Sequence, residues 1–220
     1  MGWANKLLGW TSNNGAEVNS DGALRVVDGG AGGNCYTTSA KTGTIAAAAA
    51  AGACVYAMRL NPGSTKKIYV DSIRLRYTTI VAFTTAVTQT RSLVLTRGAG
   101  AATAGGTSIP VATKKDTGYA LSQADLATGG DIRISTTGAL TVTGITWEAT
   151  NLGELTLAHV GAAGSFYEAV YEFTVRNHPV ELNPGELLGV RVGASAMDAA
   201  GTWSLGVEVA WREGTSDIDA

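Results

Sequence analysis

The sequence predicts an all-β protein, an antiparallel two-sheet sandwich with the connections of a jelly roll and an extended N-terminal arm. Three observations predict this class. Short segments alternate apolar and polar residues with a period of two, turn signals separate these segments, and long helical periodicity is absent. A chain of 220 residues is long enough for one large β domain and an arm.

The segment 68–77, IYVDSIRLRY, is the first clear strand pattern. Its apolar positions change parity between Val70 and Ile73. A parity change within one strand indicates an extra residue that is left unpaired. We therefore expect a β-bulge at Asp71-Ser72.

Later segments show the same alternation. In 166–175, Tyr167 and Tyr171 share one face, and Glu168 and Glu172 share the other. Trp211 falls on the apolar face of 203–212 and is expected in the core. The remaining expected strands are 23–27, 54–60, 80–96, 131–135, 140–147, 154–160 and 186–192.

Two tight turns support the strand assignment. The tetrapeptide LNPG occurs twice, at residues 60–63 and 182–185. Proline presets the first central position of such a turn, and glycine can supply a positive φ at the second. Both glycines, Gly63 and Gly185, are expected to adopt a positive φ.

Residues 1–52 differ from the rest of the chain. Asparagine-glycine, aspartate-glycine and glycine-glycine pairs interrupt them, and the run Ala46–Ala51 is too short to hold a helix by propensity alone. We expect a Gly/Ala-rich docking arm at 1–52, a β-sandwich at 53–214 and a short acidic tail at 215–220.

The arm carries apolar side chains that it cannot bury by itself. Trp3, Leu7 and Trp10 have the spacing of one helical face, and Leu8 lies beside them. This face either packs back onto its own sandwich or docks on a neighbouring subunit. We favour docking, because tryptophans are frequent anchors at protein interfaces. The expected partner-binding residues are Trp3, Leu7, Leu8, Trp10, Leu24 and Val26.

Composition disfavours several partners. Charged residues make up 15% of the chain, the net charge is −2, and basic residues form no cluster, so nucleic acid is not expected as a partner. No apolar stretch reaches the roughly 20 residues that span a bilayer, so no membrane is expected either. No export signal is recognised, and we expect synthesis in a host cytoplasm. Cys35 and Cys54 are expected to be free thiols.

The sequence contains no catalytic constellation. His159 and His178 have no ligand pattern around them, so neither a metal nor a cofactor is expected. Glu168 and Glu172 would be roughly 13 Å apart along one strand, beyond the roughly 9.5 Å that glycosidases tolerate. The S-x-x-K match at 64–67 lies in the wrong context for a serine nucleophile. The chain is expected not to be an enzyme.

The stretch GWANKLLGWTSNNGAEVNSDGALRVV, residues 2–27, resembles the opening of small virion structural proteins of tailed bacteriophages. The later segment LNPGELLGVRV is similar in style to jelly-roll decoration modules on phage heads. This resemblance implies a non-enzymatic protein, often trimeric, that binds the major capsid protein and clamps neighbouring capsomers. It brings no catalytic or ligand residues with it.

Together with the unburied apolar residues of the arm, this resemblance predicts a capsid decoration (cement) protein on the virion surface, bound to the major capsid protein or another virion protein. Two alternatives stay open. One is a tail, collar or baseplate component, and the other is a carbohydrate-binding β-sandwich. The second alternative requires an exposed aromatic platform, for which Trp147, Trp203 and Trp211 are the tryptophans available after the arm.

Overall fold

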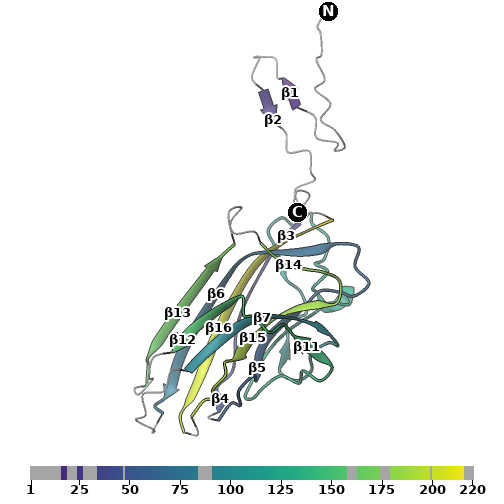
Figure 1. The fold of residues 1–220 in the computed structure, drawn as a ribbon. Helices are drawn as coiled ribbons and strands as arrows, with labels where there is room; N and C mark the ends of the chain where they lie inside the picture. The colour runs from purple at the N-terminus through teal and green to yellow at the C-terminus, as the bar shows by residue number, and fades with distance from the viewer. Residues whose placement is uncertain are drawn as a thin grey trace, which may run out of the picture.

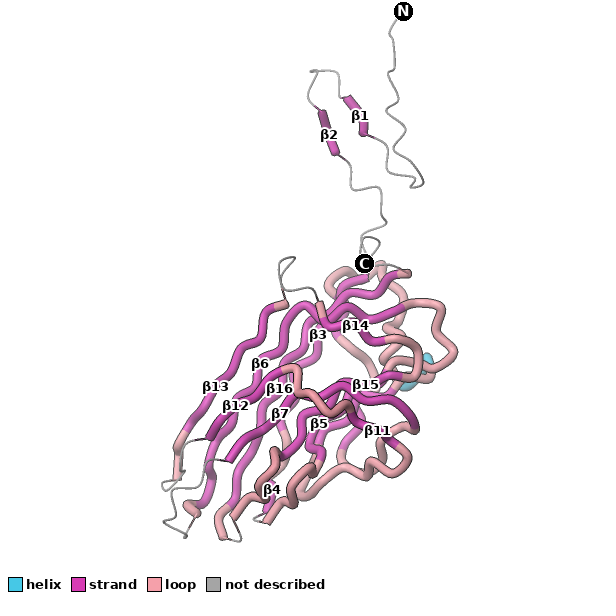
Figure 2. Tube along the Cα trace, viewed as in Figure 1, coloured by secondary structure: helices cyan, strands magenta, loops and turns pink. Residues whose placement is uncertain are grey.

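The structure is a computed structural model. It describes residues 16–18, 24–26, 34–46, 48–83, 91–157, 163–173, 179–198 and 200–215. These residues form β-strands and one short 3₁₀ helix, η1 (Leu126–Thr128), which Figure 2 shows beside the strands. No helix long and apolar enough to span a membrane occurs in this described part of the chain.

The strands are short except for the two that dominate one sheet, β6 and β16. They are β1 (Ala16–Val18), β2 (Leu24–Val26), β3 (Asn34–Lys41), β4 (Ile45–Ala46), β5 (Cys54–Arg59), β6 (Lys67–Val81), β7 (Arg91–Gly100), β8 (Thr107–Ser108), β9 (Thr113–Lys114), β10 (Asp131–Ile134), β11 (Ile145–Trp147), β12 (Gly153–Leu157), β13 (Phe166–Glu172), β14 (Val180–Leu182), β15 (Glu186–Val192) and β16 (Thr202–Gly214).

Two antiparallel sheets pack face to face, as Figure 1 shows. The β6 sheet has the order β13-β6-β16-β3-β9, with β14 also on β6 and β4 also on β16. The β7 sheet has the order β11-β7-β15-β5-β10-β8, with β12 also on β7. The principal strands therefore lie as β13-β6-β16-β3 in one sheet and β12-β7-β15-β5 in the other. This connectivity is that of a jelly roll, so the expected fold is confirmed.

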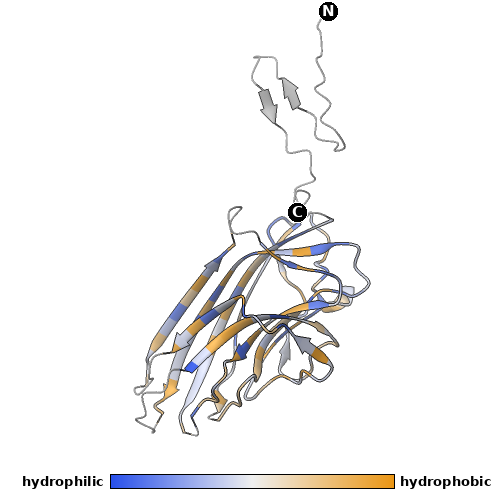
Figure 3. Cartoon of the chain, viewed as in Figure 1, coloured by the Kyte–Doolittle hydropathy of each residue, from blue (hydrophilic) through white to orange (hydrophobic). Residues whose placement is uncertain are grey.

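The core lies between the two sheets. Trp203 and Trp211 of β16 are its largest side chains, and each is at most 1% exposed. Trp211 stacks on Tyr36 with ring centroids 5.8 Å apart, and Trp203 stacks on Tyr77 at 5.4 Å. Figure 3 shows the apolar and polar residues alternating along the long strands, as half-buried strands require.

The predicted bulge in 68–77 is confirmed. Along β16, Ala210 pairs with Ser72 and the next residue, Trp211, pairs with Val70. Asp71 is therefore the extra residue. The bulge lets Val70 and Ile73 both face the core although their positions differ in parity.

Most predicted strands occur, with changed bounds. The 80–96 prediction is wrong in its limits, because β6 ends at Val81, β7 begins at Arg91, and 84–90 lie outside the described residues. In 140–147 only Ile145–Trp147 form a strand, and Thr141 makes an isolated bridge to Ala104.

The arm boundary at residue 52 is corrected by the structure. β3 pairs with β16 from Asn34↔Glu213 to Lys41↔Gly206, and β4 also pairs with β16. Tyr36 of β3 is 1% exposed and belongs to the core. The sandwich therefore includes residues from Asn34 onward, and the segment that can serve as an arm lies before it.

The alanine run is not helical in its described part. Ala46 ends β4, and Ala48 has a φ of 62°, which L-residues rarely adopt. Backbone hydrogen bonds join Ala48 to Asp198 and Ala49 to Met197. These bonds fasten residues 48 and 49 to the connection between β15 and β16.

The two LNPG turns differ. Gly185 has the expected positive φ of 83°, and Glu186 N–H donates to the Asn183 carbonyl. Gly63 does not adopt a positive φ, so that prediction is wrong. There the Asn61 carboxamide oxygen accepts from Gly63 N–H at 2.8 Å, and this Asx turn takes over the role of the left-handed glycine.

Candidate functional site

The arm residues predicted to bind a partner are only partly described. Trp3, Leu7, Leu8 and Trp10 lie outside the described residues. Leu24 and Val26 lie in β2, opposite Val18 and Ala16 of β1. The predicted strand at 23–27 is thus present as one half of a two-stranded hairpin.

The outer face of the β6 sheet carries a closed network of four charges. Arg74 Nε lies 3.1 Å from Glu168 Oε1, and Arg76 Nη1 lies 2.8 Å from Glu208 Oε1. The crossed contacts, Arg74 to Glu208 and Arg76 to Glu168, measure 3.7 and 3.6 Å. Each side chain is about one third or more exposed, and such exposed pairs contribute little stability. The network therefore shapes a charged surface more than it stabilises the fold.

Two shallow depressions flank this network. One, of about 380 Å³, has Gly206 in its floor and Lys41, Arg76 and Phe166 among its lining residues. The other, of about 190 Å³, lies against Glu172 and Val170. Gly206 leaves the floor open because it has no side chain between Arg76 and Lys41, which flank it in register.

Exposed apolar side chains lie on the same face. Phe166 and Val170 of β13 are 54% and 47% exposed, and Ile80 of β6 is 41% exposed. They share the outer parity with Arg74 and Arg76. Aromatic and arginine side chains are enriched at protein interfaces, whereas glutamate is depleted, so Phe166 and the two arginines favour a protein-binding face. Alternation along 166–175 predicts its solvent face. It does not predict the neighbouring arginines and apolar side chains, because strand pairing brings them there.

No tryptophan of the sandwich forms an open aromatic platform. Trp203 and Trp211 are buried, and Arg191 covers the ring of Trp147 with its guanidinium carbon 4.7 Å from the ring centroid. The Trp147 ring packs on Gly98 and Gly189, where a Cβ would lie 2.9 and 2.5 Å from ring atoms. The carbohydrate alternative loses the platforms that motivated it.

We expect the valine side chain of Gly189→Val to displace the Trp147 ring. The variant should lower the free energy of unfolding by about 1–3 kcal/mol, because inserting atoms into a packed site strains the structure. Urea unfolding with tryptophan fluorescence measures both effects. Gly206→Val is the matched control, because a Cβ there meets Arg76 Cβ at an ordinary 3.6 Å. An equal loss in the two variants would show that the Trp147 contact does not decide the result.

Two buried carboxylates fasten the long connection between β7 and β10 to the sandwich. Glu213 Oε1 accepts from Ser122 Oγ at 2.5 Å, Gln123 N–H at 2.9 Å and Trp211 Nε1 at 3.3 Å. Asp125 accepts from Ala112 N–H at 2.7 Å and Ser122 N–H at 3.0 Å. Burial raises the pKa of both carboxyl groups, against the opposing effect of these hydrogen bonds. These hydrogen bonds join the connection to β16 and to itself, so both carboxylates have a structural role.

The other candidate chemistry does not assemble. Among the described residues, no three His, Cys, Asp or Glu are grouped so as to hold a metal ion. His159 and His178 lie outside the described residues. Ser64 Oγ bonds locally to Lys66, and the Lys67 ammonium pairs with Glu181, so the S-x-x-K match forms no serine–lysine dyad.

Cys35 and Cys54 are free thiols, as expected. Cys54 is fully buried in β5, and burial raises its pKa to about 12. Cys35 of β3 is partly exposed, and desolvation raises its pKa as well. A raised pKa means little thiolate near neutral pH, so neither thiol has the character of a nucleophile.

No family model matches the chain, and a search of curated proteins finds no significant match. We therefore infer the function from the residues and the geometry described above.

Proposed function

We propose that this chain is a non-enzymatic structural protein that binds other protein through exposed surfaces, and that it acts as a capsid decoration protein of a tailed bacteriophage. The observation that carries the binding role is the outer face of the β6 sheet. There, Phe166, Val170 and Ile80 are exposed beside a balanced network of two arginines and two glutamates.

Two further features support a binding role over a catalytic one. The depressions on this face are shallow, and the carboxylates that line them are held in ion pairs or stand as single exposed groups on the strands. Two of the buried carboxylates, Glu213 and Asp125, accept hydrogen bonds from protein donors that fasten a connection to the sandwich. The phage assignment depends on the resemblance of residues 2–27, and the arm residues before Asn34 are its proposed anchor.

Sedimentation with capsid shells tests this proposal. Full-length protein should sediment with shells assembled from the major capsid protein of the same phage, and it should raise their melting temperature as occupancy rises. Removing residues 1–12 should abolish sedimentation while the urea unfolding curve of the sandwich stays unchanged.

Absence of binding by the full-length chain would contradict the capsid assignment, and undiminished binding by the truncated chain would contradict the role of the arm. Cryo-electron microscopy of the virion separates head from tail. A decoration protein is present in hundreds of copies and a tail component in a few to tens.

A further inference from the structure

β13 is the end strand of the β6 sheet, and among the described strands it pairs on one side only. Phe166–Glu172 pair with Thr78–Ser72 of β6. Figure 1 shows β13 as the outer edge of its sheet. An edge strand presents unpaired N–H and C=O groups, and these pair readily with a strand of another chain.

Two backbone hydrogen bonds to β6, one at each end of β13, fix the direction of the backbone groups of β13. Thr79 N–H donates to the Ser165 carbonyl at 2.9 Å, and Phe173 N–H donates to the Asp71 carbonyl at 2.8 Å. In an antiparallel pair such positions alternate, so the odd-numbered residues of β13 bond to β6. The even-numbered residues direct their backbone groups toward the open edge. They are Phe166, Glu168, Val170 and Glu172.

We propose that two copies of this chain pair through β13, strand against antiparallel strand, about a two-fold axis. The two β6 sheets then form one continuous sheet. A two-fold contact is self-complementary, so a single strand supplies both sides. This inference goes beyond the proposed function and does not depend on it, because it concerns two copies free in solution.

The charges on β13 select one register. Full overlap of the two strands places Ala169 opposite Ala169 of the second copy, and it places Glu168 opposite Val170 of that copy. Shifting one strand by two residues in either direction sets Glu168 directly opposite Glu168 or Glu172, and like charges directly opposite destabilise a pair. A shift of one residue would place the outer face of one strand on the inner face of the other.

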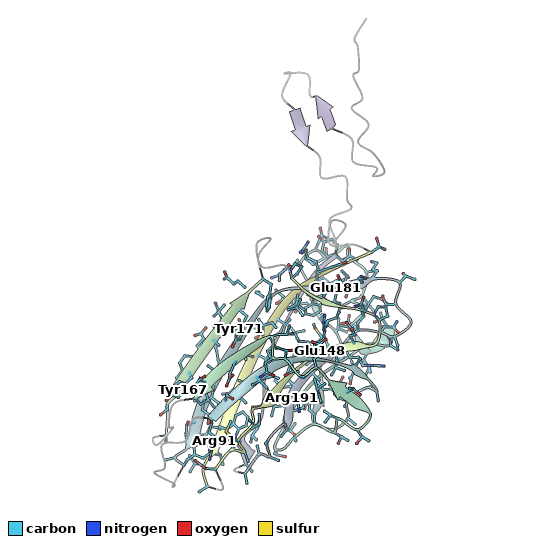
Figure 4. All side chains as sticks on the ribbon, viewed as in Figure 1. Arg91, Glu148, Tyr167, Tyr171, Glu181 and Arg191 are labelled. Atoms are coloured by element: carbon cyan, nitrogen blue, oxygen red, sulfur yellow. The ribbon has the colours of Figure 1, made fainter. Side chains whose placement is uncertain are left out.

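The selected register also pairs aromatic side chains. Tyr167 of one copy comes opposite Tyr171 of the other, on the inner face, where both are half-buried. Figure 4 shows these two tyrosines one after the other along β13. On the outer face, Phe166 comes opposite Glu172 and Val170 comes opposite Glu168, so no two exposed apolar residues of β13 face each other. Aromatic cross-strand pairs stabilise a sheet, so this register gains a stabilising pair on the inner face.

Cysteine cross-linking tests the register. Ala169→Cys in a Cys35→Ser background should form a disulfide-linked dimer on mild oxidation, seen by non-reducing electrophoresis, because directly opposite Cα atoms lie about 4.5–5.5 Å apart. Val170→Cys reports the shifted register that sets Glu168 opposite Glu172. It keeps both glutamates and should cross-link at least about tenfold more slowly. Faster cross-linking by Val170→Cys than by Ala169→Cys, or none by Ala169→Cys, would overturn the proposal.

Charge substitution at position 170 tests the same contact without covalent chemistry. Val170 faces Glu168 of the second copy, so Val170→Lys should keep or tighten the dimer, and Val170→Glu should weaken it about tenfold, since the change counts twice about the axis. Sedimentation velocity over a dilution series measures the association constant. Within one chain Val170 pairs with Arg74, so Val170→Glu should stabilise the fold of the single chain and Val170→Lys should destabilise it. A chain that is monomeric throughout the series, or equal weakening by the two variants, would contradict pairing through β13.

Discussion

Replacing Glu213 by leucine is expected to lower the free energy of unfolding by about 3 kcal/mol. Glu213 is 2% exposed and accepts hydrogen bonds from Ser122, Gln123 and Trp211. Leucine leaves these donors buried without an acceptor, and each unsatisfied buried donor costs about 1–3 kcal/mol, partly offset by removal of a buried charge. Urea unfolding measures the loss, and hydrogen exchange should report faster opening at residues 122–124.

Glu213→Gln is the matched control. Its amide oxygen can still accept from the three donors, and its nitrogen replaces the oxygen that Gln123 N–H approaches at 3.1 Å. We expect a smaller loss, about 1 kcal/mol. A loss equal to that of the leucine variant would show that the acceptor oxygen does not explain the result.

The contribution of Glu213 to the free energy of unfolding should decrease as the pH rises. Burial raises the pKa of Glu213 above its ordinary value of 4.5, so the folded chain binds this proton more tightly than the unfolded chain. The resulting stability is fully present below pH 4.5 and is lost as the pH rises through the folded-state pKa. Asp125 acts in the same direction and is retained in Glu213→Gln. The wild-type stability should therefore fall more steeply above pH 4.5 than that of the glutamine variant, and parallel curves would contradict this role for Glu213.

The strands that the sequence predicted best are those whose residues alternate between apolar and polar. The parity change between Val70 and Ile73 located the Asp71 bulge, and the tyrosines of 166–175 face inward as expected. β3 escaped notice because its sequence, NCYTTSAK, has one large apolar residue, Tyr36. Its strand conformation comes from pairing with β16 and from the stacking of Tyr36 on Trp211. Both contacts join residues far apart in the sequence, so a local sequence pattern cannot predict them.

The outer face of the β6 sheet shows a similar limit to what a sequence pattern can predict. The solvent exposure of Glu168 and Glu172 followed from alternation alone. Their neighbours did not, because Arg74 lies far from Glu168 and Glu208 in sequence, and jelly-roll pairing brings the three together. Glu213 was missed for a related reason. A carboxylate is ordinarily expected in solvent, and its burial depends on a connection that reaches it through Ser122.

Trp203→Ala should be the most destabilising single substitution, with a loss of about 4 kcal/mol. Trp203 is fully buried, stacks on Tyr77, and pairs in register with Thr79 of β6 and Ile45 of β4. Its truncation opens a cavity where three strands meet. Urea unfolding measures the loss.

Two variants separate packing from other effects at Trp203. Trp203→Phe should lose much less stability, since it keeps an aromatic ring and the indole N–H has no acceptor among the described residues. Trp147→Ala should also lose less, because Trp147 is only partly buried. A greater loss for Trp147→Ala than for Trp203→Ala would contradict the core assignment.

Because Trp203 acts through packing, partner binding in Trp203→Ala should fall with the folded fraction. A substitution on the outer face, such as Val170→Glu opposite Arg74, should change binding without lowering stability.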